Sequence, residues 1–522
     1  MALFSFLDKA HSQAKPGYNR WLVPPAALSI HLCIGQIYAY SVFNKPMTLV
    51  IGVTESTDLD WKLTTLGWIF SLALFTLGAS AAIFGKWLER VGPRMAMFVS
   101  ALCFSGGFFA AALGVFTHQI WLVYLGHGFL GGIGLGLGYI SPVSTLIKWF
   151  PDRPGMATGM AIMGFGGGAM IASPLSVMLM DAFRSINSIG VAETFLCMGA
   201  IYLTFMMFGV FTIRIPPKDW KPTGWNPTTT IKSSIENNYY VSADGAVRTF
   251  QFYLLFAVLM LNVTAGIGVL GQASVMIQEM FSSVSVGEER AVSAAVAGGF
   301  VGLLSLFNMI GRFLWSSLSD RIGRKNTYHV FFLLGAALYV AIPTIGDLGS
   351  ILFFVVFFGI IITMYGGGFA TIPAYLGDLF GTSQVGAIHG RLLLAWSAAA
   401  ILGPVLINYI RAYQIETLLL PPAEVYSITM YIMAGLLMVG FISNSLVKPV
   451  APEHFIAQDP TANLPTEVHN SKKGIADSVA QNTTFEEIDK IDLRMPLAWL
   501  FIGIPLLWGV TQTLIKSLAL FI

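Results

Sequence analysis

Long apolar runs, separated by short polar segments, follow one another along most of the chain. Each run is close to the roughly 20 residues that an α-helix needs to cross the hydrocarbon core of a bilayer. The first set lies near residues 21–43, 64–84, 95–116, 119–142, 156–180 and 193–213, and the second near 249–275, 291–318, 328–346, 350–376, 390–410 and 425–446. The pattern predicts an all-α membrane protein with two sets of six spans.

Polar segments between these runs set the expected domain boundaries. We expect a cytoplasmic leader at residues 1–20, an N-terminal six-helix bundle at 21–214, a proline-containing cytoplasmic linker at 215–248 and a C-terminal six-helix bundle at 249–447. Residues 448–494 are rich in Pro, Asn, Ser and acids, so they predict a disordered cytoplasmic tail. Residues 495–522 are apolar again and long enough for an additional transmembrane helix.

The basic residues indicate the orientation of the chain in the membrane. With both ends of the twelve-span body in the cytoplasm, eighteen Lys and Arg residues lie in inside segments and five in outside segments. Cytoplasmic loops carry the excess of Lys and Arg in membrane proteins. We therefore expect a multi-pass monomer in a plasma membrane (a bacterial inner membrane), with its N-terminus in the cytoplasm.

Composition narrows the class of protein further. The chain of 522 residues is 55% hydrophobic and 11% charged, whereas soluble domains carry about 25% charged residues. Its three cysteines all lie in apolar runs and give no disulfide framework. We find no P-loop, HExxH or CxxC spacing, so we expect no enzyme activity, no cofactor, no bound metal and no nucleic-acid partner.

One polar stripe marks the run that begins near residue 291. Ser305, Asn308, Arg312 and Ser316 have spacings that place them on one face of a helix. An arginine at the centre of a membrane span costs about 2.5–3.5 kcal/mol on insertion scales, and its guanidinium cannot lose its proton. Such a charge faces a cavity and a compensating partner. We interpret Arg312 as the residue that binds an anion, with Asn308 orienting it or touching the substrate.

Two similar loops follow the second and the eighth spans. Each contains an acid, an arginine, a spacer, a glycine and a further base, and the residues are Glu89, Arg90 and Arg94 in the first loop and Asp320, Arg321 and Arg324 in the second. A carboxylate in such a turn can face the N-terminus of a neighbouring helix. We predict that these loops gate the cytoplasmic side, with Arg153 as a further candidate. The alternative is a basic cytoplasmic loop with a turn glycine.

This duplicated loop is the signature of the major facilitator superfamily, which the chain resembles over residues 20–448. Glu89 stands at the usual aspartate position and Pro93 at a usual basic one. Further segments resemble the oxalate/formate antiporter family and related monocarboxylate porters: Lys148-Trp-Phe-Pro151-Asp152-Arg153-Pro-Gly155, Tyr365-Gly-Gly-Gly368-Phe with Pro373, Asp378-Leu-Phe-Gly381 and Asn308…Gly311-Arg312. The resemblance implies a twelve-span fold of two six-helix bundles that transports carboxylates.

Two departures from these relatives bear on the substrate. The oxalate exchangers are expected to use a second cation, a Lys in span 11, where this chain has Trp396. One buried cation matches one carboxylate, because an unpaired second carboxylate would be desolvated. The monocarboxylate porters place an Asp four residues before the substrate-binding Arg, where this chain has Asn308. These residues favour a monocarboxylate over oxalate.

Other polar and aromatic side chains in the spans are candidates for the same site. Those predicted to bind substrate are Gln36, Tyr38, Tyr40, Tyr139, Tyr365 and Trp396, and those predicted to carry a coupling proton are His31 and His127. A tyrosine offers an apolar ring and a hydroxyl donor, which suits a small carboxylate. The alternative is that the aromatic residues only pack and that the histidines only hydrogen-bond within the bundle.

These observations predict a secondary active transporter of small carboxylate anions such as formate, acetate, lactate or pyruvate. Its partners would be the bilayer, the carboxylate and either protons or a counter-transported anion. No carboxylate lies deep in the spans, which favours antiport or uniport, while proton symport through His127 stays open. The alternatives are dicarboxylate exchange of the oxalate/formate type and a transporter-like membrane sensor.

Overall fold

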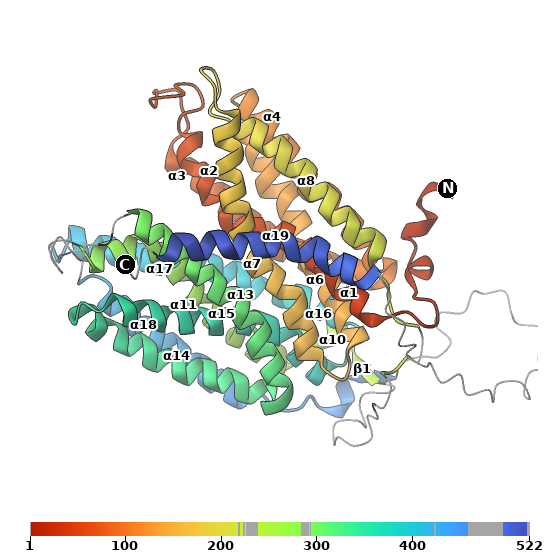
Figure 1. Ribbon diagram of the computed structural model, residues 1–522. Coiled ribbons are helices and arrows are strands. Elements are labelled where there is room, and N and C mark those ends of the chain that lie inside the picture. Colours follow the sequence, from red (N-terminus) through yellow and green to blue (C-terminus); the bar gives the residue numbers. More distant parts are fainter. Residues whose placement is uncertain are drawn as a thin grey trace, which may run out of the picture.

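In the computed structural model, the described residues are 2–217, 220–222, 225, 239–282, 292, 294–421, 424–457 and 494–518. Within these ranges, thirteen helices are long and apolar enough to cross a membrane. They form two bundles with one further helix on the flank (Figure 1). The predicted all-helical fold with an additional C-terminal span is therefore confirmed.

Short 3-10 turns, η1 (Ala2–Leu7), η2 (Lys9–Ser12) and η3 (Arg20–Leu22), precede the N-terminal bundle. The elements of this bundle are α1 (Val23–Ile34), η4 (Gly35–Ala39), α2 (Ser41–Met47), α3 (Leu63–Val91), α4 (Pro93–Phe116), α5 (Ile120–Val123), the π-helical turn η5 (Tyr124–Leu130), α6 (Gly131–Trp149), α7 (Pro154–Phe183) and α8 (Val191–Thr212).

The first predicted span, 21–43, is broken in the structure. The 3-10 turn η4 separates α1 from α2, and it has about 3.0 residues per turn where an α-helix has 3.6. A Cβ on Gly35 would overlap the carbonyl oxygen of Phe165, so η4 and α7 meet backbone to backbone. The break changes which of the later side chains in this span share a face.

The linker contributes β1 (Tyr239–Val241) and α10 (Ala243–Ala246). The C-terminal bundle consists of α11 (Phe250–Met280), α13 (Ala294–Ile322), α14 (Arg324–Asp347), α15 (Ile351–Phe380), α16 (Val385–Leu392), α17 (Leu394–Glu416) and α18 (Ser427–Leu446), followed by η8 (Pro452–His454) and β2 (Phe455–Ala457). The eleventh span starts at Val385 and is divided at Leu393, whereas the sequence predicted one run from residue 390.

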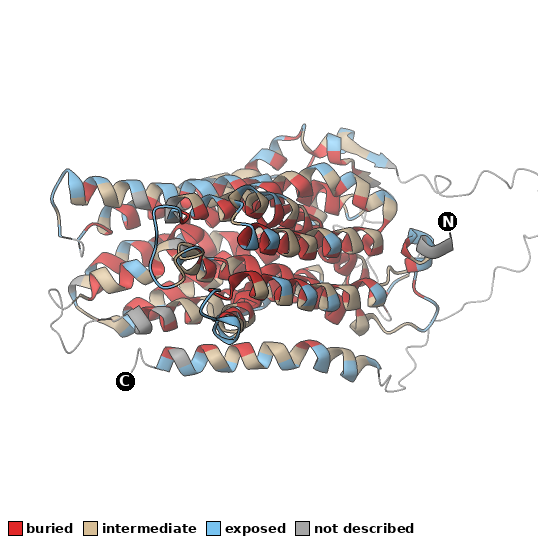
Figure 2. Ribbon diagram, turned by 90° about the horizontal axis from the view of Figure 1, so that it is seen from above, coloured by how far each residue is buried: buried red, intermediate tan, exposed pale blue. Residues whose placement is uncertain are grey.

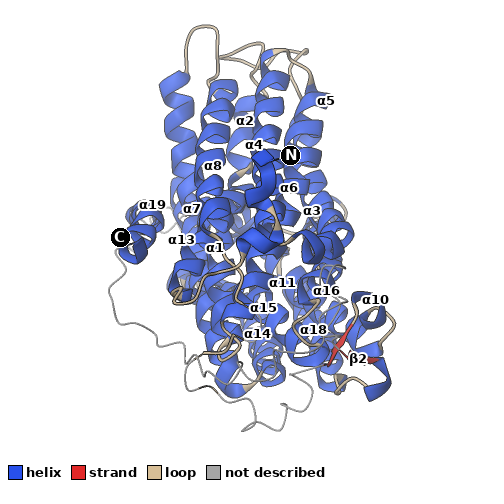
Figure 3. Cartoon of the chain, turned by 90° about the vertical axis from the view of Figure 1, so that its right-hand side faces the viewer, coloured by secondary structure: helices blue, strands red, loops and turns tan. Residues whose placement is uncertain are grey.

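The two short strands tie the linker to the segment after α18. They pair antiparallel, with Tyr239 opposite Ala457 (Figure 3). The strand β2 lies inside the range predicted as a disordered tail, and residues 458–493 of that range lie outside the described residues.

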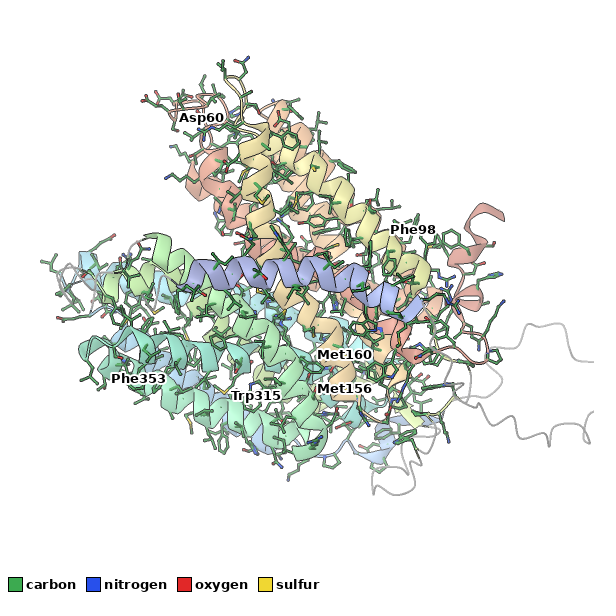
Figure 4. All side chains as sticks on the ribbon, in the orientation of Figure 1. Asp60, Phe98, Met156, Met160, Trp315 and Phe353 are labelled. Carbon is green, nitrogen blue, oxygen red and sulfur yellow. The ribbon has the colours of Figure 1, made fainter. Side chains whose placement is uncertain are left out.

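The two bundles are close together at one end and diverge at the other (Figure 1). We call the end that carries the N-terminus, α10 and β1 the closed end, and the opposite end the splayed end. The seam between the bundles is formed mainly by α7 against α13 and by α3 against α16, with further contacts of α7 with α15 and of α3 with α17. In Figure 4, Met156 and Met160 of α7 lie where that helix meets the C-terminal bundle.

The outer surface of the molecule is apolar, unlike the surface of a water-soluble protein. Buried residues gather between the helices (Figure 2), while large apolar side chains such as Trp68, Ile83 and Phe353 face outward. Lipid is as apolar as these side chains, so an outer surface of this kind is stable within a bilayer.

Candidate functional site

Arg312 lies on α13 at the seam and is completely buried. Its Nε donates to Asn308 Oδ1 at 3.0 Å, and its Nη1 donates across the seam to the carbonyl oxygen of Ile162 on α7 at 3.3 Å. Its Nη2 has no hydrogen-bond partner among the described residues. A buried charged donor without a partner is strongly disfavoured, so this nitrogen is suited to receive an anion.

Aromatic rings from both bundles enclose the guanidinium. Its Cζ lies 5.6 Å from the ring centre of Phe165 on α7 and 5.3 Å from that of Phe369 on α15. Trp396 on α17 packs against both rings, at centroid distances of 5.4 and 4.6 Å. Cation–π contacts of this kind are worth about 2 kcal/mol when desolvated, so the rings stabilise the buried charge.

Two glycines make this enclosure sterically feasible. A Cβ on Gly166 would lie 3.1 Å from Arg312 Nε, and one on Gly366 would overlap the carbonyl oxygen of Asn308. The backbones of α7 and α15 therefore approach α13 closely from two sides. Small residues allow such approaches between membrane helices, and these two glycines shape the site as well as the packing.

Three of the predicted tyrosines gather around Arg312. The hydroxyls of Tyr38 and Tyr365 lie 3.2 Å apart, across the seam from each other. The ring of Tyr139 lies 5.4 Å from Phe165 and 5.5 Å from Trp396. Its hydroxyl and the indole nitrogen of Trp396 are buried without partners in the part of the chain that the structure describes. These groups can hydrogen-bond to a ligand held by Arg312.

The other candidates of the first span lie in different surroundings. Tyr40 stacks on His127 with a centroid distance of 4.4 Å, and Phe108 packs edge-on against the same imidazole. This cluster is in the interior of the N-terminal bundle. Gln36 is fully buried, and neither atom of its amide has a partner among the described residues.

His31 and His389 flank Tyr139. The Nδ1 of His31 contacts the carbonyl oxygen of Ala161, and its Nε2 lies 3.1 Å from that of Tyr139. His389, on α16, has its ring 5.8 Å from the Tyr139 ring. His389, Phe165 and Phe369 could not be selected from the sequence, because their apolar surroundings are those of packing residues.

The first loop and the second loop each place a carboxylate at a helix N-terminus of the opposite bundle. Asp320 accepts from the backbone nitrogens of Gly155 and Met156, both at 2.8 Å, at the start of α7. Glu89 accepts from the nitrogen of Gly386 at 3.3 Å, at the start of α16. The positive end of a helix dipole favours such anions. We call these two contacts the latches.

Basic side chains support the latches from their own bundles. Lys148 pairs with Glu89 at 2.9 Å, and Arg324 pairs with Asp320 at 2.6 Å and lies 3.5 Å from Asp378. Arg94 donates to the carbonyl oxygens of Phe6, His11 and Ile213, so it anchors the N-terminal segment. Arg90, Arg153 and Arg321 are exposed.

A further ion pair cluster joins the bundles through the linker. Asp244 on α10 accepts from Lys86 of the N-terminal bundle and from Arg391 of the C-terminal bundle. The hydrogen bond from Lys86, followed by that from Arg391, lowers the pKa of Asp244 to about 2. Because the pKa is lowered, the ion pairs of Asp244 contribute to stability above the ordinary pKa of a carboxyl group. This contribution is lost as the pH falls through about 2. The cluster therefore persists at physiological pH.

Comparison with known proteins shows which family the chain matches. A family model described as Major Facilitator Superfamily matches residues 32–404 and again residues 280–521. The oxalate:formate antiporter of Oxalobacter formigenes is 27% identical over 387 residues, which cover 74% of this chain and 83% of that protein. Apicoplast pyruvate carrier 1 of Toxoplasma gondii is 21% identical over 386 residues, covering 65% and 68% of the two chains.

Solved structures show the same fold. The fucose:proton symporter FucP of Escherichia coli superposes with a TM-score of 0.58 at 13% identity, covering 83% of this chain and all of that one. The proton:xylose symporter XylE gives a TM-score of 0.54 at 15% identity, covering 81% and 94%. At 13% and 15% identity, this similarity is one of fold, that is, of the arrangement of the helices.

Proposed function

Since the chain belongs to the major facilitator superfamily and is therefore a secondary transporter and not an enzyme, we propose that it carries small carboxylate anions by alternating access, with Arg312 binding the carboxylate. The observation that supports this proposal is the guanidinium itself. It is fully buried at the seam, and one of its terminal nitrogens lacks a partner among the described residues. A carboxylate there would complete its hydrogen bonds with a charge-assisted contact.

The chemistry around Arg312 favours a small substrate with one negative charge. A single carboxylate neutralises the guanidinium, and the tyrosine hydroxyls of Tyr38, Tyr139 and Tyr365 can donate to its oxygens. Trp396 packs against Phe165 and Phe369 and presents an indole where the oxalate exchangers are expected to have a lysine. A second carboxylate would lack a matching cation at that position, so we propose formate, acetate, lactate or pyruvate as the class of substrate.

The site lies where both bundles contribute, which is what alternating access requires. Ile162 and Phe165 come from the N-terminal bundle, and Asn308, Arg312 and Phe369 come from the C-terminal one. Rigid-body rocking about such a site exposes it to each side in turn. The latches join the bundles at the closed end, so we propose that the structure represents the outward-facing state and that reorientation opens the latches.

Counterflow in proteoliposomes tests the proposal. Purified protein is reconstituted with each unlabelled acid inside, and uptake of labelled formate, acetate, lactate, pyruvate and oxalate is measured. We expect uptake of at least one monocarboxylate, and a loss of at least a hundredfold in Arg312→Ala. Arg184→Ala, which removes an exposed arginine, is the matched control and should transport normally.

Two results would contradict the proposal. Full uptake by Arg312→Ala would show that the guanidinium does not bind the substrate. A preference for oxalate over every monocarboxylate would show that the interpretation of Trp396 is wrong and would favour dicarboxylate exchange.

A further inference from the structure

The thirteenth span, α19 (Arg494–Ser517), lies on the flank of the molecule beside both α7 and α13 (Figures 1 and 3). These are the two helices that meet at Arg312. Near the site, a Cβ on Gly167 of α7 would lie 2.8 Å from Met309 Sδ of α13 and 3.2 Å from Leu506 Cδ1 of α19. The three helices therefore converge directly behind the binding site.

Near the closed end, α19 is attached to the N-terminal bundle. The indole nitrogen of Trp499 donates to the carbonyl oxygen of Trp21 at 3.3 Å. The ring of Phe501 packs against Phe205 and Phe208 of α8, each at a centroid distance of 4.6 Å. A directed hydrogen bond and two aromatic contacts fix this segment to its bundle.

Toward the splayed end, α19 also reaches the C-terminal bundle. Thr513 is 7% exposed and faces Gly302 of α13, where a Cβ would lie 3.9 Å from Thr513 Cβ. Gly509 continues to face Ile171 of α7. At this point the contact with α13 is made by small residues, which allow helices in lipid to come together closely.

Two features weaken the middle of α19. Pro505 lies inside the helix and lacks the N–H that would bond to Phe501. A cavity of about 270 Å³ lies between α19 and α1, α7 and α8, with Pro505 and Trp508 among its lining residues. The cavity therefore lies beside a helix-weakening proline in the middle of α19.

We propose that α19 is a brace, fixed to the N-terminal bundle through Trp499, Phe501 and Gly509 and holding α13 through Thr513 in the conformation seen here. When the bundles rotate as rigid bodies, a helix attached to both must release one of them. The Thr513–Gly302 contact is the one that yields, so α19 sets how readily the carrier reorients. This inference does not depend on which anion is carried.

Disulfide trapping tests the brace. The distance at Gly302 and Thr513 matches the separation of about 3.8 Å between Cβ atoms in disulfides, so the pair Gly302→Cys and Thr513→Cys should cross-link on oxidation. The background is the full chain with Cys33, Cys103 and Cys197 replaced by Ala. The matched control is the pair Ile171→Cys and Gly509→Cys, which ties α19 to the N-terminal bundle alone.

Two measurements are made on each pair, oxidised and reduced. We expect oxidation of the α13 pair to lower carboxylate counterflow at least tenfold, reversibly, and oxidation of the control pair to change it less than twofold. Hydrogen exchange of residues 385–392, at the α16 latch, needs no substrate. We expect it to slow at least tenfold on oxidation of the α13 pair and to stay unchanged in the control pair.

The outcomes separate this inference from the proposed function. If counterflow is absent even in the reduced protein but exchange responds as described, carboxylate transport is wrong and the brace stands. If the α13 pair is cross-linked, as shown by mass spectrometry, and neither measurement changes, the brace is wrong. If oxidation of either pair lowers counterflow equally, α19 does not move together with the N-terminal bundle.

Discussion

Arg312 keeps its charge inside the protein because several kinds of interaction replace water around it. Asn308 and the Ile162 carbonyl accept two of its hydrogen bonds, and the faces of Phe165 and Phe369 supply negative electrostatic potential. The neutral Asn308 orients the guanidinium without neutralising it, so the positive charge stays available to a ligand. The proposed affinity for anions rests on this positive charge, which no carboxylate among the described contacts of Arg312 neutralises.

Replacing Phe369 by Leu should reduce the stability of the empty protein. The change removes a cation–π contact with Arg312, worth about 0.5–2 kcal/mol. We expect a lower melting temperature in detergent, measured by thermal unfolding. Phe353→Leu is the control, because that ring is 56% exposed on the outer surface. Equal melting temperatures for the two variants would contradict a role for the ring.

Gly366→Ala should disrupt the site through one added carbon. A Cβ there would overlap the Asn308 carbonyl and lie 3.1 Å from Arg312 Cγ. Overpacking costs about 1–3 kcal/mol, and the displaced Asn308 would no longer orient the guanidinium. We expect a lower melting temperature and at least tenfold weaker binding by equilibrium titration. Gly435→Ala, where no heavy atom lies within 4 Å of the added Cβ, should leave both measurements unchanged.

At the scale of elements, each bundle supplies a carboxylate that binds the first turn of a helix in the other bundle. Asp320 of α13 binds α7, and Glu89 of α3 binds α16. The two arrangements repeat the same chemistry in both halves, as expected for a fold built from repeats. Both latches open when these helix pairs separate.

Asp320→Asn should weaken one latch while keeping its size and shape. The amide is neutral, so its interaction with the α7 N-terminus and with Arg324 falls by about 1–3 kcal/mol. We expect faster hydrogen exchange in residues 154–160, measured by mass spectrometry. Asp181→Asn, an exposed position near the other end of α7, serves as the control. Unchanged exchange in Asp320→Asn would show that the latch contributes nothing to closure.

The sequence predicts the features that have a strong local pattern. Span lengths, the duplicated loops and the polar stripe of Asn308 and Arg312 follow from hydropathy and helical spacing. Phe165 and Phe369 could not be selected, since an aromatic ring in an apolar helix has the same local pattern whether it faces Arg312 or lipid. Tyr38 and Tyr40 are two residues apart and therefore point to different sides of the span, and the apolar run does not reveal which side faces Arg312.

At the scale of the whole molecule, the latches, the linker cluster and the short sheet all lie at the closed end. Asp244 joins Lys86 and Arg391, and the strands join the linker to the segment after α18. The basic residues predict that this end faces the cytoplasm. The splayed end would then face the outside when the latches are formed.

Single cysteines test this orientation in intact cells, in the same cysteine-free background. Ile186→Cys, at a position 93% exposed in the loop before α8, should react with a membrane-impermeant maleimide added outside. Glu453→Cys, whose native side chain is 80% exposed at the closed end, should react only after permeabilisation. The reverse pattern would show that the protein is inserted the other way.

The uncompensated guanidinium also has a consequence for energetics across a polarised membrane. Under the proposed function, an empty carrier holds one positive charge at its centre, whereas a carrier loaded with one carboxylate is neutral there. Voltage therefore acts on the empty return step, by up to about 2.3 kcal/mol per 100 mV if the charge crosses the whole field. In a cell that is negative inside, returning outward with a second anion avoids that barrier, and one-for-one swapping of acids becomes the faster cycle.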